Sequence, residues 1–281
     1  MRRLFRLPRR RGPLVLDVQS LAIRTEGASG PALAAPLPRV AVIAHWDPVG
    51  RLSRSVSELT SSLVSHGYHV VIASSADGTG PLEWPGEEPA NVTVLRRPNV
   101  GYDFGSWATA LDKYPKIAEA DQVLLLNDSL AGPFQPVDHL LRHFDESGAD
   151  VWGMTDTNQF GHHLQSYCLG FKRGCLREEP LARFWRDVRV EQSRDDVIWR
   201  YEIGLSRLLC SERFSIDAAI RYRKVVRDGE NPTIIGWRRL FDVGFPFVKR
   251  QLLREPEVAP DGSKVREEVQ RVFGVNVDQW V

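Results

Sequence analysis

The chain has 281 residues, of which 42% are hydrophobic and 26% charged, a balance typical of a globular protein. Its formal net charge is +1, so the composition gives no indication of a nucleic-acid partner. No run of 18 apolar residues is present, and we therefore expect no transmembrane helix. The three cysteines are irregularly spaced, which favours reduced thiols in a cytoplasmic protein over a disulfide framework.

The composition of the first 38 residues differs from that of the rest. Residues 24–38 are rich in Gly, Ala and Pro and predict a flexible linker. Regular apolar patterning begins at Arg39. We therefore expect three parts: a basic arm and linker over 1–38, a folded domain over 39–256, and a peripheral C-terminal helix within 257–281.

The basic arm predicts a membrane-surface contact. Residues 1–12 hold six Arg and no acidic residue, and without them the chain has a formal charge of −5. Leu4, Phe5 and Leu7 lie among these arginines, so cationic and apolar groups could both meet an anionic leaflet. The sequence thus predicts a cytoplasmic protein that can sit peripherally on the inner face of the plasma membrane. The alternative is a disordered terminus whose arginines only aid solubility.

Strand-length apolar runs alternate with helical periodicity through the first two thirds of the chain. Such alternation predicts an α/β fold with a Rossmann-type, mostly parallel sheet flanked by helices. The expected strands are 39–45, 68–75, 91–97, 121–128, 150–155 and 164–172, and the helices among them are 52–66, 104–114 and 137–147.

The C-terminal half is expected to be more helical. Residues 176–188 and 195–210 have helical apolar spacing, 214–222 has the composition of a strand, and 263–273 should form a peripheral helix. In such sheets ligands bind beyond the carboxyl ends of the strands, so the residues directly after each strand are the first candidates for a site. Asp47, in the segment HWD after the first strand, is one of them.

Asn127 and Asp128 follow the fourth strand in the segment NDS. An acid at this position can hold Mg²⁺ or Mn²⁺ against a diphosphate, because Mg²⁺ is commonly bound by one or two carboxylates together with phosphate oxygens. The alternative is that Asn-Asp-Ser only caps the next element, and the spacing alone favours neither.

The segment PNVGYDFGSW, which follows the third strand, combines two glycines with aromatic and acidic side chains before a helix. Glycines allow close approach of the backbone to a ligand, and a helix N-terminus favours anions. Asn99, Gly101, Tyr102 and Asp103 are therefore candidates for nucleotide binding, with Asp103 accepting from a ribose hydroxyl or a base. The alternative is a tight turn with Asp103 as helix cap.

Two further segments carry candidate side chains. Glu202 lies about 100° from the apolar stripe of its helix, so it need not be buried, and a carboxylate near Trp199 and Tyr201 could act as a general base. An ordinary solvated glutamate is the commoner case. Lys249, Arg250 and Arg254, within PFVKRQLLR, could clamp a diphosphate or simply face solvent.

Seven ordered blocks resemble the rhamnan synthesis protein F family of bacterial polysaccharide glycosyltransferases. They extend over roughly residues 39–256. The blocks are NVGYDFGSW, LLLNDSLAGPF, VWGMTD, HLQSYCLGF, YEIGLS, NPTIIGWRRL and GFPFVKRQLLR.

This resemblance implies a GT-A-like nucleotide-sugar fold. It also implies transfer of a sugar, often L-rhamnose from dTDP-rhamnose, to a lipid-linked glycan. NDS then takes the place of the family's Asp-x-Asp metal motif, with Asn127 first and Ser129 last, which leaves the need for a metal open. YEIGLS takes the place of a Glu-Asp base motif in which Ile203 replaces the Asp, and Asp156 competes with Glu202 as the base.

The expected function is therefore an inverting glycosyltransferase. A base removes the proton of the acceptor hydroxyl while that oxygen attacks the anomeric carbon opposite the diphosphate. The alternative is a non-catalytic nucleotide-sugar-binding partner in a polysaccharide assembly complex, which the irregular NDS and YEI motifs keep open.

Overall fold

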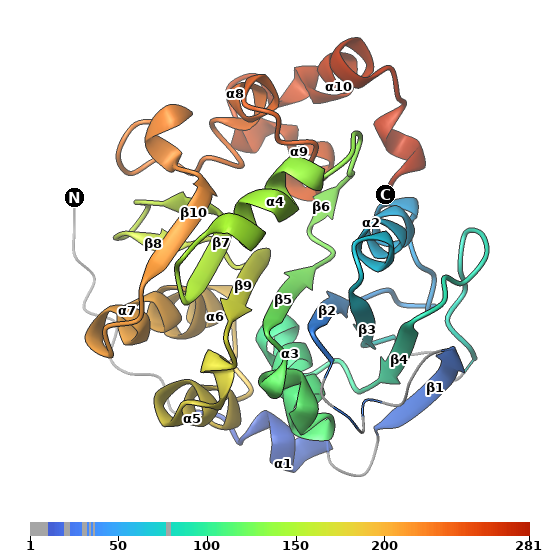
Figure 1. Ribbon diagram of the computed structural model, residues 1–281. Helices are drawn as coiled ribbons and strands as arrows, with labels where there is room; N and C mark the ends of the chain where they lie inside the picture. The colour runs from blue at the N-terminus through green and yellow to red at the C-terminus, as the bar shows by residue number, and fades with distance from the viewer. Residues whose placement is uncertain (1–10, 20–22, 30–32, 34, 36, 77–79) are drawn as a thin grey trace.

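The computed structural model describes residues 11–19, 23–29, 33, 35, 37–76 and 80–281. In these ranges, nine strands form one sheet in the order β1-β4-β3-β2-β5-β9-β7-β10, with β8 paired to β7 (Figure 1). A second, two-stranded sheet joins β6 to β11.

The strands are β1 (Arg24–Ser29), β2 (Arg39–His45), β3 (His69–Ser74), β4 (Val92–Arg96), β5 (Gln122–Asn127), β6 (Leu130–Ala131), β7 (Val151–Thr157), β8 (His163–Leu164), β9 (Cys168–Lys172), β10 (Ile216–Ile220) and β11 (Val248–Lys249). The helices are α1 (Val15–Gln19), α2 (Arg54–Ser65), α3 (Tyr102–Lys113), α4 (Asp138–Glu146), α5 (Glu179–Arg186), α6 (Arg194–Val197), α7 (Ile203–Ser211), α8 (Trp237–Asp242), α9 (Arg250–Arg254) and α10 (Val265–Phe273).

The main sheet is mostly parallel, as the sequence predicts. Strands β4, β3, β2 and β5 run parallel to one another, and β7 is parallel to β10. Strand β9 is antiparallel to both of its neighbours, β5 and β7, so it joins two parallel groups whose carboxyl ends point the same way. Strands β5 and β7 therefore deliver the residues that follow them to one edge of the sheet.

Both faces of the sheet are covered. Val40 and Val42 of β2 belong to one buried cluster with Phe104 and Trp107 of α3. Ala41 and Ile43, which alternate with them, belong to a second cluster that includes residues of α2 and α4. This alternation follows from the two-residue period of a strand and explains why β2 has no polar residue between Val40 and Ala44.

A third buried cluster joins the C-terminal helices α8, α9 and α10 to the segment after β5. The pairing of β11 with β6 sets this arrangement, with Lys249 opposite Leu130. The chain after residue 245 is thereby brought back to the carboxyl end of β5 (Figure 1).

The N-terminal region differs from the expected arm and linker. Residues 24–29, expected within a linker, form β1, which pairs antiparallel with β4 at the edge of the sheet. Val15 of α1 is fully buried beside α3, and its backbone N–H donates to Val188. The folded unit therefore includes residues from before Arg39. Residues 1–10, which hold most of the expected basic arm, lie outside the described ranges.

Two expected elements are divided. The strand expected over 164–172 is β8 and β9 separated by a turn, and the helix expected over 195–210 is α6 and α7 joined by a π-helical turn at Ile198–Glu202. A π-turn inserts an extra residue into the helical repeat, which periodicity cannot reveal.

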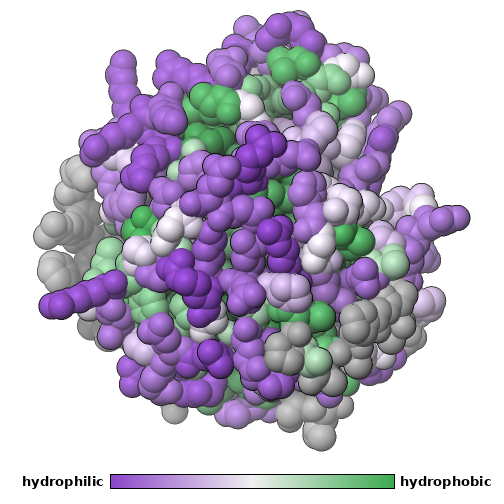
Figure 2. All heavy atoms as spheres, viewed as in Figure 1, coloured by the Kyte–Doolittle hydropathy of each residue, from purple (hydrophilic) through white to green (hydrophobic). Residues whose placement is uncertain are grey.

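The surface seen in Figure 2 is mostly hydrophilic, with small apolar patches near the C-terminal helices at the top. None of the helices in the described ranges has the length and apolar character needed to cross a membrane.

Candidate functional site

A pocket of about 440 Å³ opens beyond the carboxyl ends of β2, β3, β4 and β5. It also reaches the N-terminus of α3 and the start of α9. Its lining residues are His45, Trp46, Ser75, Asn99, Tyr102, Asp103, Ser106, Asp128, Ser129, Arg194, Lys249, Arg250, Gln251, Arg254 and Glu255. Its volume falls in the range of small-molecule sites, and the side chains that converge on it are mainly polar, with a few aromatic rings.

Most candidates for nucleotide binding meet in this pocket. Asn99, Tyr102, Asp103, Lys249 and Arg250 all line it, although they come from segments about 150 residues apart in the sequence. The backbone of Tyr102 has a φ of 55°, in the left-handed region, and its side chain is 45% exposed. The turn before α3 thus holds an aromatic ring at the pocket at a cost in backbone strain.

Asp103 and Asp128 form the acidic side of the pocket. Burial, followed by the nearby charge of Asp128, raises the pKa of Asp103 to about 6. Asp128 Oδ2 accepts from the backbone N–H of Trp46 at 3.0 Å, which ties the end of β5 to the end of β2.

Asn127 is engaged inside the protein. Its side-chain amide donates to Asp103 Oδ2 at 2.7 Å, and its Oδ1 accepts from both the N–H and the hydroxyl of Ser129, at 3.1 and 2.6 Å. Asn127 therefore orients Asp103 and the NDS turn, while the neighbouring Asp128 lines the pocket.

The cationic side of the pocket comes from the far end of the sequence. Burial lowers the pKa of Lys249 to about 8, although the charge of Glu202 opposes this shift. Its Nζ donates to Ser129 at 3.0 Å and lies 5.3 Å from the centroid of the Tyr167 ring. Arg250 donates to the hydroxyl of Ser53, and its buried Nε has no hydrogen-bond partner in the described part of the chain. The Arg250 side chain is half-buried and lines the pocket, where its guanidinium can make charge-assisted hydrogen bonds to an anion.

Sequence reasoning missed three side chains that complete the pocket. Trp46, 48% exposed, lies beside the expected Asp47, and its place in HWD was the available signal. Glu255 directly follows α9, whose last residue, Arg254, was expected among the cations of PFVKRQLLR and lines the pocket. Arg194 begins α6, and nothing local in the sequence indicates that it reaches this edge of the sheet.

Asp47 and Gly101 lie outside the pocket lining. Asp47 Oδ1 accepts from the backbone N–H groups of Val49 and Arg51, both at 2.9 Å, so it closes the turn after β2. Gly101 precedes α3 with a φ of 79°, and a Cβ there would lie 2.5 Å from the Val15 side chain. Their positions give both residues a structural part in the turns that carry Trp46 and Tyr102.

Glu202 lies at the end of the π-helical turn with its side chain 18% exposed. Oε2 accepts from Ser166 at 2.6 Å and Oε1 lies 3.4 Å from His163 Nε2. Burial raises its pKa, but the contacts from His163 and Ser166, together with the charge of Lys249, outweigh burial and leave the pKa below its ordinary value. The interaction with Lys249 links Glu202 to the pocket.

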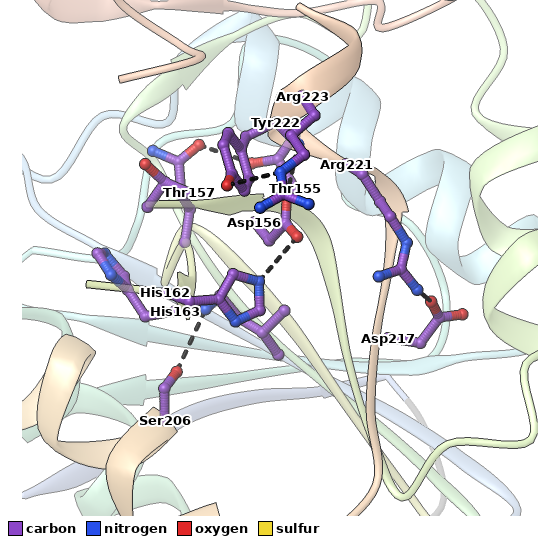
Figure 3. Close-up of polar contacts among 12 residues, drawn as sticks. Thr155, Asp156, Thr157, His162, His163, Ser206, Asp217, Arg221, Tyr222 and Arg223 are labelled. Carbon is purple, nitrogen blue, oxygen red and sulfur yellow. Dashed lines mark hydrogen bonds and ion pairs between the residues drawn. The ribbon is translucent and has the colours of Figure 1, made fainter. Parts of the chain in front are cut away.

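Asp156 lies in β7 with its side chain 4% exposed. Oδ1 accepts from the backbone N–H of Tyr222, and Oδ2 lies 3.0 Å from His162 Nε2 (Figure 3). The His162 side chain is 46% exposed. The carboxylate of Asp156 thus fixes an exposed imidazole and the chain after β10, and its own oxygens are both in use.

A purely protein-built metal centre is absent from the described residues, which contain no cluster of three or more His, Cys, Asp and Glu able to hold an ion. Asp128, together with oxygens from a bound diphosphate, satisfies the requirements of Mg²⁺, which keeps waters and uses few protein ligands. Asn127 does not fit the expected role of second ligand, because its side-chain oxygen already accepts two bonds from Ser129.

Fold and pocket together define the class: a mixed α/β protein with a mainly parallel sheet and a charged pocket at the carboxyl ends of its strands. The chain belongs to the rhamnan synthesis protein F family, whose model matches residues 90–278. Membership of this family indicates involvement in polysaccharide synthesis. The match extends past residue 256 through α10, so the C-terminal helix expected outside the resemblance lies within the family region.

Two relatives align with more than half of the chain. The Virulence protein VirA of Vibrio anguillarum is 32% identical in an alignment 209 positions long, which covers 62% of this chain and 67% of VirA. The uncharacterized protein y4gN of Sinorhizobium fredii is 24% identical in an alignment 210 positions long, which covers 72% of this chain and 54% of that protein.

Proposed function

We propose that the protein is a GT-A-like glycosyltransferase that transfers a sugar from a nucleotide diphosphate to a lipid-linked glycan of a cell-surface polysaccharide. The donor that we propose is dTDP-L-rhamnose. The observation that carries this proposal is the pocket, in which Arg194, Lys249, Arg250 and Arg254 surround a space large enough for a nucleotide. The family membership supports the polysaccharide as product.

The pocket offers a partner for each part of such a donor. The four cations can bind the two phosphates, since guanidinium and ammonium groups make short charge-assisted hydrogen bonds to phosphate oxygens. The exposed rings of Trp46 and Tyr102 provide stacking surfaces for the base. Asp103, buried at the start of α3, can accept from a ribose hydroxyl or a base N–H.

A divalent cation, Mg²⁺ or Mn²⁺, would be held by Asp128 and the phosphate oxygens of the donor. When bound, it would help to neutralise the leaving diphosphate. Lys249 and Arg250 line the same pocket and would supply positive charge to that group without a metal.

The reaction that we propose is inverting. The acceptor oxygen attacks the anomeric carbon, the bond to the diphosphate breaks, and a base takes the proton of the acceptor hydroxyl. Glu202 is the base favoured by position, because the charge of Lys249 couples it to the pocket. The negative charge of a bound diphosphate would offset the positive charge of Lys249. The pKa of Glu202 would then rise, and Glu202 would be a stronger base.

A second candidate, a nucleotide-sugar-binding partner without activity, is favoured by one observation: both oxygens of Glu202 and both of Asp156 are engaged within the protein. Both candidate functions require that the protein bind a nucleotide sugar. A thermal-shift screen of dTDP, UDP and GDP sugars tests this binding. At a donor concentration a hundred times its Kd, binding adds about 2.7 kcal/mol, or roughly 5–10 °C in Tm for a chain of this size. Equal and negligible shifts with every nucleotide sugar would remove both candidates.

A further inference from the structure

Two aromatic rings touch each other at the protein surface outside the pocket. Phe160 is 59% and Trp199 44% exposed, and their ring centroids lie 5.3 Å apart. The two residues come from segments about 40 positions apart in the sequence. Single exposed apolar side chains are common, but here the fold assembles a two-ring surface in contact with water.

The backbone at both aromatic residues has an uncommon conformation. Phe160 has a φ of 64°, and Gly161 follows with a φ of 115°. Trp199 lies in the π-helical turn Ile198–Glu202. A left-handed bulky residue and a π-turn each cost conformational energy and are found disproportionately at functional sites. Both irregularities fall where the two rings meet.

The loop that carries Phe160 is held in place. The backbone N–H of Gln159 donates to Thr157, and Asn231 donates to the side chain of Gln159 at 3.2 Å. On the other side of the loop, His163 contacts Glu202, which shares its turn with Trp199. The backbone on either side of Phe160 is thus held before any ligand arrives, which reduces the entropy cost of binding.

The loop that carries Phe160 also carries a polar side chain of defined orientation. His162 Nε2 is bound to Asp156 at 3.0 Å, and the structure gives Nδ1 no hydrogen-bond partner among the described residues (Figure 3). The imidazole is 46% exposed, lies 6.4 Å from the Tyr222 ring, and follows Phe160 by two positions. An exposed aromatic surface with an oriented hydrogen-bonding group on the same loop suits an amphipathic ring.

We propose that Phe160, Trp199 and His162 form the binding site for a pyranose ring of the acceptor glycan. A pyranose presents a face of C–H groups that can stack on Phe160 and Trp199, while its hydroxyls bond to His162. This inference rests on the proposed function for the identity of the sugar as acceptor. The two segments that carry the rings also meet at Glu202, because His163, on the loop of Phe160, contacts Glu202, in the turn of Trp199.

Saturation-transfer NMR with the methyl pyranosides of L-rhamnose, D-glucose, D-galactose and N-acetyl-D-glucosamine tests the site directly. The variants are Trp199→Ala and Phe160→Asn, because Asn tolerates the left-handed backbone at that position. Trp46→Ala in the nucleotide pocket is the matched aromatic control, with a ring of similar exposure. Titration with dTDP follows the nucleotide site of each protein separately.

We expect at least one pyranoside to bind the wild type and Trp46→Ala, with binding weakened about tenfold or more in Trp199→Ala and Phe160→Asn, where stacking is lost. The affinity for dTDP should fall in Trp46→Ala alone. Unchanged pyranoside binding in both ring variants would overturn the inference. So would a wild type that binds dTDP but no pyranoside, or self-association that both ring variants abolish. Failure of the wild type to bind dTDP, with ring-dependent pyranoside binding intact, would instead overturn the proposed donor.

Discussion

At the scale of single residues, Arg250 is the side chain that we propose to contact the phosphates of the donor. It is half-buried and lines the pocket. A charged hydrogen bond contributes about 1.5–3 kcal/mol, so Arg250→Met should raise the Kd for dTDP roughly 10–100-fold. Isothermal titration calorimetry measures this change.

Arg271→Met is the control for Arg250→Met, because Arg271 is 67% exposed and pairs with Glu268 on α10. It should bind dTDP with wild-type affinity. Equal affinities of the two variants for dTDP would show that Arg250 does not contact the phosphates.

The choice between Glu202 and Asp156 as the base is also decided by single residues. Glu202→Gln keeps the bond from Ser166 but removes the charge, and should lower turnover about 10²–10⁴-fold with donor affinity nearly unchanged. Asp156→Asn should act on acceptor binding, because Asp156 orients His162. Steady-state rates measured against both substrates separate the two effects. A sharply lowered kcat with an unchanged acceptor KM in Asp156→Asn, beside a Glu202→Gln variant of normal kcat, would reverse the assignment.

At the scale of elements, the start of α3 shows how the N-terminal segment supports the pocket. Gly101 has a φ of 79°, and an added Cβ would meet Val15 at 2.5 Å. Gly101→Ala should therefore lower the free energy of unfolding by about 1–3 kcal/mol. Urea denaturation measures the loss.

Adding Val15→Ala to Gly101→Ala removes the steric contact but leaves the backbone strain. The double variant should be less destabilised than the sum of the two single variants, since the two substitutions share one contact. Strict additivity, or a neutral Gly101→Ala, would mean that α1 does not pack on α3 as described.

The limits of sequence reasoning also belong to elements. The strands β2 to β5 are buried on both faces and appear as continuous apolar runs, so their positions were predictable, and Asp103 and Asp128 could be placed just beyond strands. Strand β1 is an edge strand with the sequence RTEGAS. Apolar and polar residues do not alternate in this sequence, so it could not be predicted as a strand. The convergence of Arg194 and Lys249 on one pocket depends on the pairing of β11 with β6 and on the π-turn after α6, which are tertiary features.

At the scale of the whole molecule, the charge distribution leads to a membrane prediction. The sequence of residues 1–12 carries six Arg while the remainder has a formal charge of −5. Each basic residue near an anionic leaflet contributes about 1 kcal/mol, so we expect the full chain to co-sediment with vesicles containing phosphatidylglycerol, and less so at high salt.

The matched variant for the vesicle experiment is the full chain with Arg2, Arg3, Arg6, Arg9 and Arg10 replaced by Gln. It leaves residues from Arg11 onward intact, including the contacts of Gly12 and Val15 with the folded unit. It should lose most of its binding to anionic vesicles. Equal pelleting of both proteins, or pelleting that does not change with salt, would show that the arginines of residues 1–12 do not bind the protein to anionic membranes.

We propose that the pocket holds a nucleotide sugar for transfer, and the release of dTDP from dTDP-L-rhamnose tests this most directly. Many transferases hydrolyse their donor slowly without an acceptor, so the wild type should release dTDP on prolonged incubation. Asp128→Asn removes the charge of a pocket carboxylate that we propose to act at the diphosphate, and it should release none. No release by the wild type from dTDP, UDP or GDP sugars, with or without Mg²⁺ and a lipid-linked glycan, or equal release by both proteins, would contradict the account.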